Sequence, residues 1–173
     1  LLLCAHALHA QRRVCLVFTS DLHYGMTRDF RGRKATSAEV CRAMADAIRK
    51  LPGTMLPRDG GVGAGEPVDS LDFVVCGGDV ANRMERGVQT AAESWRQFAA
   101  EWLAPGMPEL LVLPGNHDIS NATGFIRPLT PPRDATCAAA IYNHGVRPRT
   151  PRTAGTFDFA TDKTHYIVER EGI

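Results

Sequence analysis

The stretch LLVLPGNHDI, residues 110–119, decides the fold class, because it joins a short apolar run directly to three polar side chains. Its first six residues are typical of a buried β-strand that ends at a proline and a glycine. Asn116, His117 and Asp118 follow at once, and each can bind a cation or exchange hydrogen bonds with a ligand. Whether they form a simple polar turn or a site depends on what the fold brings next to them.

Two more apolar runs, at 13–20 and 71–78, predict strands that are buried on both faces. Amphipathic segments at 36–51 and 88–103 lie between the three predicted strands and have the spacing of helices. This alternation of strands and helices predicts an α/β fold in which the strands pair largely in parallel.

The two predicted helices have clear start signals or clear apolar faces. The first begins with a capping box of Thr36 and Glu39 and ends before Pro52. Its expected core face consists of Val40, Met44, Ala47, Ile48 and Leu51. The expected core face of the second helix consists of Val88, Ala91, Trp95, Phe98 and Trp102.

Composition excludes several classes of protein. The 173 residues contain 44% hydrophobic and 23% charged residues, as expected of one folded domain. Twenty basic residues against 19 acidic residues give a formal net charge of +1, which argues against a dedicated nucleic-acid binder. The five cysteines show no C-x-x-C spacing, which argues against a disulfide scaffold or a zinc ribbon.

The remaining segments carry weaker signals. Residues 1–10 are apolar and free of acids, as in the remnant of a signal peptide, which predicts a secreted or periplasmic protein; the alternative is a frayed N-terminal strand or helix. Ten residues cannot span a bilayer, so no transmembrane segment is expected. The Gly- and Pro-rich stretch 52–67 predicts a loop, residues 134–143 a short helix, and residues 155–169 a hairpin of two strands.

Each of the three predicted strands ends in a polar cluster. Asp21 and His23 follow the first strand, Asp79 and Asn82 follow the second, and the Asn-His-Asp triplet follows the third. Any one of these residues alone would be ordinary turn or cap chemistry, and Asn82 is equally a helix cap or a site residue. Because the carboxyl ends of parallel strands form the ligand crevice of an α/β sheet, the three clusters together predict one site. Oxygen and nitrogen donors without thiolates suit Mn, Fe or Zn.

The order D-x-H, G-D and G-N-H-D resembles the calcineurin-like metallophosphoesterase superfamily, and G-N-H-D at 115–118 is the most diagnostic part. The resemblance covers nearly all of the chain after residue 10. It implies a layered α/β/β/α sandwich of mixed sheets with a dinuclear metal centre. It also implies metal ligands by position: Asp21 and His23 for the first ion, Asp79 for both ions, and Asn116 for the second.

The same resemblance assigns the chemistry to the triplet. His117 would be the general acid for the leaving group or would stabilise charge in the transition state, and Asp118 would orient its ring. A hydroxide on the two metal ions would attack the phosphorus atom. The implied activity is the metal-dependent hydrolysis of a phosphate ester, with monoesters, diesters, nucleotides and phosphoproteins all open as substrates.

One departure from the family pattern concerns the C-terminal motifs. The later lone histidine and the G-H-x-H motif of the family are not recognisable, and neither His144 nor His165 has the right context. We therefore expect residues 11–173 to be the N-terminal part of a metallophosphoesterase domain that is truncated at its C-terminus and lacks part of the metal shell. The alternative is a non-catalytic binding module with a degenerate metal site.

Overall fold

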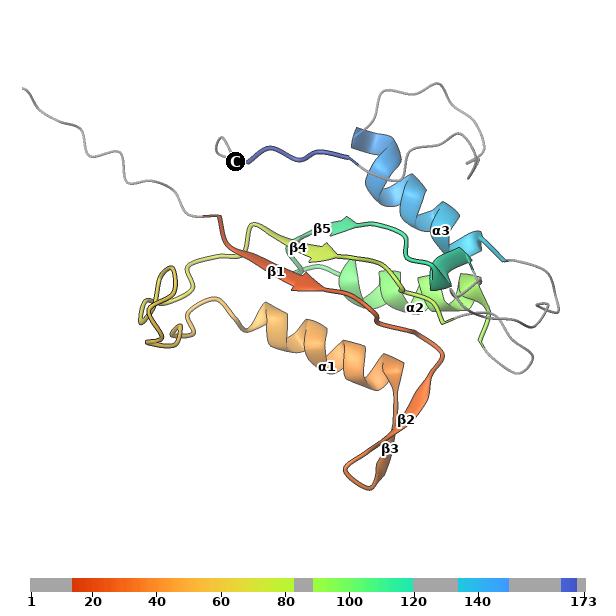
Figure 1. The fold of residues 1–173 in the computed structure, drawn as a ribbon, viewed down its shortest axis with the longest axis horizontal. Coiled ribbons are helices and arrows are strands. Elements are labelled where there is room, and N and C mark those ends of the chain that lie inside the picture. Colours follow the sequence, from red (N-terminus) through yellow and green to blue (C-terminus); the bar gives the residue numbers. More distant parts are fainter. Residues whose placement is uncertain (1–13, 83–88, 120–133, 150–165, 171–173) are drawn as a thin grey trace, which may run out of the picture.

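A three-stranded parallel sheet in the order β1–β4–β5 forms the centre of the protein (Figure 1). Its strands are β1 (Leu16–Thr19), β4 (Phe73–Cys76) and β5 (Glu109–Val112). The computed structural model describes residues 14–82, 89–119, 134–149 and 166–170. Thr19 pairs with Cys76, and Cys76 pairs with Val112, so the three strands end level with one another. This register brings the three polar clusters to the same edge of the sheet, as predicted.

Two helices cover one face of this sheet. They are α1 (Ser37–Arg49) and α2 (Ala91–Trp102), which run side by side beneath the strands in Figure 1. The predicted capping box is present, because the Thr36 side chain accepts from the Glu39 N–H while the Glu39 side chain accepts from the Thr36 N–H. Phe98 and Trp102 of α2 are fully buried in the core against the strands. Ala91 is also buried and Trp95 is half-buried, so the predicted face of α2 is confirmed from Ala91 to Trp102, while Val88 lies outside the described residues.

The predicted core face of α1 is partly wrong. The residues of α1 that are buried are Cys41, Ala45 and Ile48, whereas Val40 is 53% exposed and Ala47 is exposed. The small side chains of Cys41 and Ala45 lie on the side that meets the core. The helix is therefore rotated relative to the expected orientation, although Ile48 and Met44 still contact the core. This rotation turns Val40 outward, away from the core.

The prediction that β1 is buried on both faces is also wrong. Leu16 is 47% exposed and Phe18 is 66% exposed, although β4, its central neighbour, is mostly buried. Successive side chains of a strand point to opposite faces, and the helices α1 and α2 cover only one of them. Val17 packs against the core, whereas Leu16 and Phe18 on either side of it point to the uncovered face, so the apolar run of β1 does not indicate burial on both sides.

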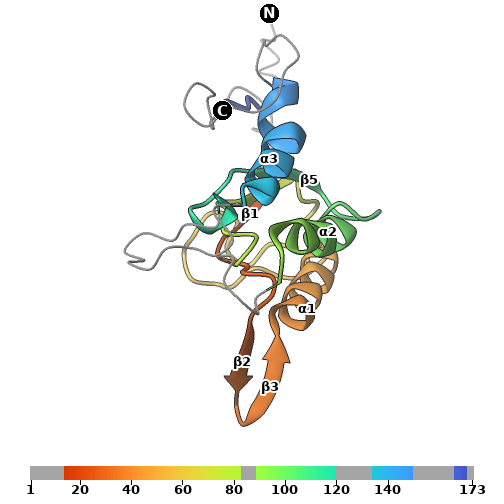
Figure 2. The ribbon, with the colours of Figure 1, turned by 90° about the vertical axis from the view of Figure 1, so that its right-hand side faces the viewer.

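An antiparallel hairpin that the sequence did not predict follows β1. Its strands are β2 (Thr27–Phe30) and β3 (Arg33–Thr36), and it projects from the body of the protein (Figure 2). Arg31 and Gly32 both have positive φ, at 51° and 78°, as a two-residue type I′ turn requires. The segment is charged and mostly exposed, so it lacks the apolar alternation by which strands are found in a sequence.

The predicted helix at 134–143 is present as α3 (Thr136–Ile141) and continues as a π-helical turn, Tyr142–Val146. α3 packs against α2, and the turn contacts β5. The stretch 52–67 is a loop, as predicted. The expected leader and residues 155–165 of the expected hairpin lie outside the described residues, and 166–169 form no strand. The combination of parallel and antiparallel sheets with helices confirms the predicted α/β class, and the C-terminal truncation stays a prediction.

Among the described residues, no helix has the length and apolar character needed to cross a membrane.

Candidate metal centre

The segments that follow β1 and β4 remain paired beyond the ends of the strands. The Asp21 N–H donates to the Gly78 carbonyl at 3.0 Å, and the His23 N–H donates to the Asp79 carbonyl at 2.9 Å. One residue further on, the Tyr24 N–H donates to the Val80 carbonyl at 2.8 Å. These hydrogen bonds hold the D-x-H segment against the G-D segment along their whole length.

Tyr24 fixes this pair of segments to the helical layer. Its side chain is fully buried, and its hydroxyl donates to the Glu101 carboxylate at 2.5 Å and accepts from the Trp102 Nε1–H at 3.0 Å. The Ser94 hydroxyl donates to the Tyr24 carbonyl at 3.1 Å. Burial is the main reason that the pKa of Tyr24 is raised, so the hydroxyl stays protonated and remains a donor.

Three of the predicted metal ligands have strained backbones. Asp21, His23 and Asp79 have φ angles of 57°, 45° and 52°, in the left-handed region that side chains other than glycine avoid. In the described part of the chain, Arg31 of the hairpin turn is the only other such non-glycine residue. Each such residue costs of order 1–3 kcal/mol, and such conformations concentrate at functional sites. The strain therefore makes these positions candidates for a functional site.

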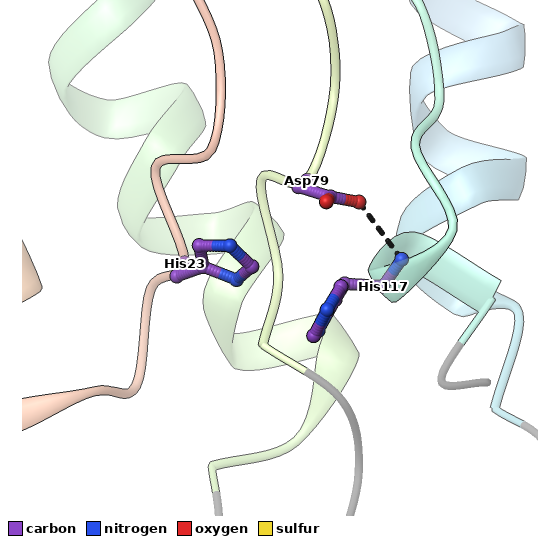
Figure 3. A group of neighbouring side chains, drawn as sticks. All are labelled: His23, Asp79 and His117. Atoms are coloured by element: carbon purple, nitrogen blue, oxygen red, sulfur yellow. Dashed lines mark hydrogen bonds between the residues drawn. The ribbon is translucent and has the colours of Figure 1, made fainter. Parts of the chain in front are cut away.

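Three side chains from the three strand ends converge. A ring nitrogen of His23, a carboxylate oxygen of Asp79 and a ring nitrogen of His117 all lie within 4.8 Å of one another (Figure 3). The backbone N–H of His117 donates to Asp79 Oδ1 at 2.8 Å. The rings of His23 and His117 are 4.5 Å apart, centre to centre, and nearly perpendicular.

This group fits a cation. Nδ1 of His23 is buried and, within the described ranges, has no hydrogen-bond partner, which is costly unless another group completes it. Imidazole nitrogen and carboxylate oxygen together suit Zn, Fe or Mn. Asp21 lies at the rim, with Oδ1 3.7 Å from His23 Nε2 and most of its side chain exposed. Its carboxylate accepts a hydrogen bond from the Ser20 hydroxyl, and Asp21 is outside the group of three converging side chains.

Two glycines let the loops approach one another. Gly78 has a φ of 102°, and a Cβ added to it would lie 2.3 Å from the Gly115 N atom. A Cβ added to Gly115 would lie 2.2 Å from Asp79 Oδ1. Gly78 is thus needed for both its backbone angle and its close contact, whereas Gly115 is needed for close contact alone.

A family model described as calcineurin-like phosphoesterase matches residues 16–166, which include all three motifs. The chain belongs to the calcineurin-like phosphoesterase family. The predicted resemblance is therefore confirmed over most of the chain. No curated protein and no solved structure gives a significant match. Phosphate esters are the substrates of this family, and its members generally bind divalent metal ions, which agrees with the group around Asp79.

Asp118 lies beneath the site and is fully buried. One oxygen accepts from the Ala81 N–H at 2.8 Å and contacts Cys137 Sγ at 3.3 Å, and the other accepts from the Gly115 N–H at 2.8 Å. Burial raises the pKa of Asp118, and these three hydrogen bonds oppose the rise. The expected contact of Asp118 with the ring of His117 stays a prediction. The role of Asp118 in joining the two loops could not be predicted from the sequence.

The other predicted site residues have varied outcomes. Asn116 is exposed beside His117, and its metal role stays a prediction. Asn82 is not the cap of α2, whose N-cap is Thr90. Asn82 instead extends the loop pairing by donating its N–H to the Tyr24 carbonyl at 3.2 Å. His144 is half-buried beside Trp95 and is outside the group of possible metal ligands, as expected.

Proposed function

We propose that this chain is a metal-dependent hydrolase of phosphate esters whose active centre is the group of His23, Asp79 and His117. The observation that carries the proposal is the approach of three donor atoms, from three distant segments, to within 4.8 Å of one another. Two of these residues, His23 and Asp79, have left-handed backbone conformations, which concentrate at functional sites.

We assign the metal-holding residues as the family pattern implies. Asp21 and His23 would hold one ion, Asn116 a second, and Asp79 both, so that the centre is dinuclear. When bound, the ions would activate a water molecule and neutralise charge on the phosphate. Asp79 is well placed for the shared role because it lies between the loops, with its carbonyl accepting from His23 and Oδ1 accepting from the His117 N–H.

The protein's own proton chemistry is assigned to His117. Its ring lies beside the donor atoms of His23 and Asp79, where the phosphate of a substrate would be bound. From there it can donate a proton to the leaving-group oxygen or stabilise negative charge on the phosphate as the ester bond breaks. The hydrogen bond from its backbone N–H to Asp79 keeps its main chain fixed during this step.

Asp79→Ala tests the proposal. We expect Mn²⁺ or Zn²⁺ to stimulate hydrolysis of p-nitrophenyl phosphate and of its diester by the unchanged chain. Loss of Asp79 should weaken metal binding, measured by calorimetry, by at least about 100-fold, since even outer partners of a metal site contribute 10- to 100-fold. The exposed Asp69 provides the matched control, Asp69→Ala. An Asp79→Ala protein with full activity would refute the assignment, and metal binding without turnover of either ester would indicate a non-catalytic binding module instead.

A further inference from the structure

A hollow of about 320 Å³ lies directly beside the metal centre, between the end of β1, the β2–β3 hairpin and α1. Asp21 and His23 form its wall on the side of the centre, Arg28 and Phe30 belong to the hairpin, and Val40 and Met44 to the helix. Ligand pockets in proteins begin at about this size and combine an apolar lining with a few polar groups.

The lining of this hollow is mostly apolar and includes side chains that would otherwise have no reason to face outward. Phe30 is 63% exposed and Val40 is 53% exposed, although both are large and apolar. Val40 is turned toward the hollow by the same rotation of α1 that buries Cys41. Apolar side chains that gather at a hollow, rather than being scattered singly, indicate a binding surface.

The hydroxyl groups of the two serines in the lining already have partners. Ser20 donates to the carboxylate of Asp21, and the Ser37 hydroxyl accepts from the Met26 N–H at 3.2 Å. A sugar or another polyhydroxyl group would have to compete with these hydrogen bonds, whereas an aromatic or aliphatic group can pack against the apolar side chains of the lining without doing so. The lining therefore favours an apolar occupant over a polar one.

The charge of the hairpin complements an anionic ligand. The hairpin segment 27–36 contains four basic residues and one acidic residue, and Arg28 is part of the lining of the hollow. Such an excess attracts the negative charge of a phosphate group as it approaches. The hairpin thus attracts an anion at long range, while Arg28 and Asp29 place one charge of each sign in the lining of the hollow, whose interior is largely apolar.

We propose that this hollow binds the organic group of the substrate, and that the substrate class is phosphate esters with an aromatic or aliphatic group. The inference rests on the proposed function, because the phosphate must be held at the adjacent centre. Asp21 and His23 belong both to the proposed metal centre and to the lining of the hollow. The organic group of a substrate whose phosphate is bound at the centre would therefore lie in the hollow. Val40 and Phe30 then contact this group and set the preference for it.

The double variant Val40→Ser/Phe30→Ser tests the inference. Both side chains are largely exposed, so the fold should be retained. We expect the ratio of kcat/KM for 1-naphthyl phosphate to that for glycerol 2-phosphate to fall by about tenfold, the lower range of the effect of an apolar pocket contact. The intrinsic reactivity of the two esters cancels, because each variant is compared with the unchanged chain. Val62→Ser/Met55→Ser, a pair of exposed residues in the 52–67 loop and outside the lining, is the matched control.

A binding measurement separates this inference from the proposed function. We expect the Mn²⁺-loaded chain to bind phenylphosphonate about tenfold more tightly than inorganic phosphate in calorimetry, and the Val40/Phe30 variant to lose this preference. If no ester is hydrolysed but this pattern holds, the proposed function fails and the binding site stands. Equal affinity of the unchanged chain for the two ligands overturns the inference. An equal loss of kcat/KM for 1-naphthyl phosphate and glycerol 2-phosphate in the Val40→Ser/Phe30→Ser variant also overturns it. A loss of the preference for the naphthyl ester in the control variant does so too.

Discussion

The carboxylate of Asp118 accepts a hydrogen bond from the backbone N–H of Ala81 at 2.8 Å and thereby joins the segment after β5 to the segment after β4. Its second oxygen accepts from the Gly115 N–H, also at 2.8 Å. Ala81 is two residues from Asp79, and Gly115 is two residues from His117. One buried side chain thus fixes the distance between two segments that carry the candidate metal ligands.

Asp118→Asn should loosen this junction without changing its size. The amide nitrogen of asparagine would face a backbone N–H in place of an acceptor, so at least one buried donor loses its partner. We expect a loss of about 1–3 kcal/mol in the free energy of unfolding, measured by urea denaturation. Asp69→Asn, an exposed matched change, should alter it by less than about 0.5 kcal/mol. Equal stability of the two variants would contradict the role of Asp118 as a clamp.

Gly115→Ala should disturb the centre by steric overlap alone. The new methyl group would lie 2.2 Å from Asp79 Oδ1 and 2.4 Å from the Asp79 N atom, so the two segments must separate. We expect a destabilisation of about 1–3 kcal/mol together with weaker binding of Mn²⁺. Gly61→Ala is the comparison, since its new methyl group would meet only an Asp59 side-chain oxygen at 3.2 Å. Unchanged metal affinity in Gly115→Ala would show that the segments can move apart without harm.

The position of the site could be predicted from the sequence because it depends on topology. Strands at 71–78 and 110–115 and the polar residues after them follow from apolar runs and their ends, and the parallel pairing follows from the intervening helices. The register then brings His23, Asp79 and His117 together without further information. Three short motifs therefore sufficed for the fold class and for the sheet edge at which these residues meet, whereas the ligand set of Asp21, His23, Asp79 and Asn116 stays a prediction.

What could not be predicted depends on side-chain direction and on long-range contacts. The rotation of α1 that exposes Val40 comes from the small size of Cys41 and Ala45, which a pattern of apolar residues does not distinguish from larger neighbours. The exposed face of β1 depends on which side the helices cover. The contact of Cys137 with Asp118 joins residues 19 positions apart and has no local signal.

His117→Ala distinguishes a metal ligand from a proton donor. The ring lies close enough to His23 and Asp79 to be a ligand, whereas the family pattern assigns it to proton transfer. We expect turnover of p-nitrophenyl phosphate to fall by about 10²- to 10⁴-fold, as is typical for the loss of a general acid. Metal affinity, measured by calorimetry, should stay close to that of the unchanged chain. A loss of metal affinity as large as that of Asp79→Ala would instead make His117 a ligand.

Alkaline pH should unfold this protein through its buried thiols. Burial is the main cause that raises the pKa of Cys76 from its ordinary value of 9.0 to about 12 and that of Cys41 to about 11. Below about pH 9 both thiols keep their protons in the folded and unfolded states, so their contribution to stability is fully present. As the pH rises further, the unfolded chain releases these protons while the folded chain holds them. Stability must then fall, by about 1.4 kcal/mol per pH unit for each thiol.

Cys76→Ala tests this linkage. The variant has a lower stability at every pH because it leaves a small cavity, but its stability should decline less steeply between about pH 9.5 and 11, since one fewer proton is released on unfolding. Urea denaturation at a series of pH values gives the slope of stability against pH for each protein. The two slopes should differ by about 1.4 kcal/mol per pH unit. Parallel slopes for the two proteins would mean that the thiol of Cys76 ionises as readily in the folded protein as in the unfolded chain.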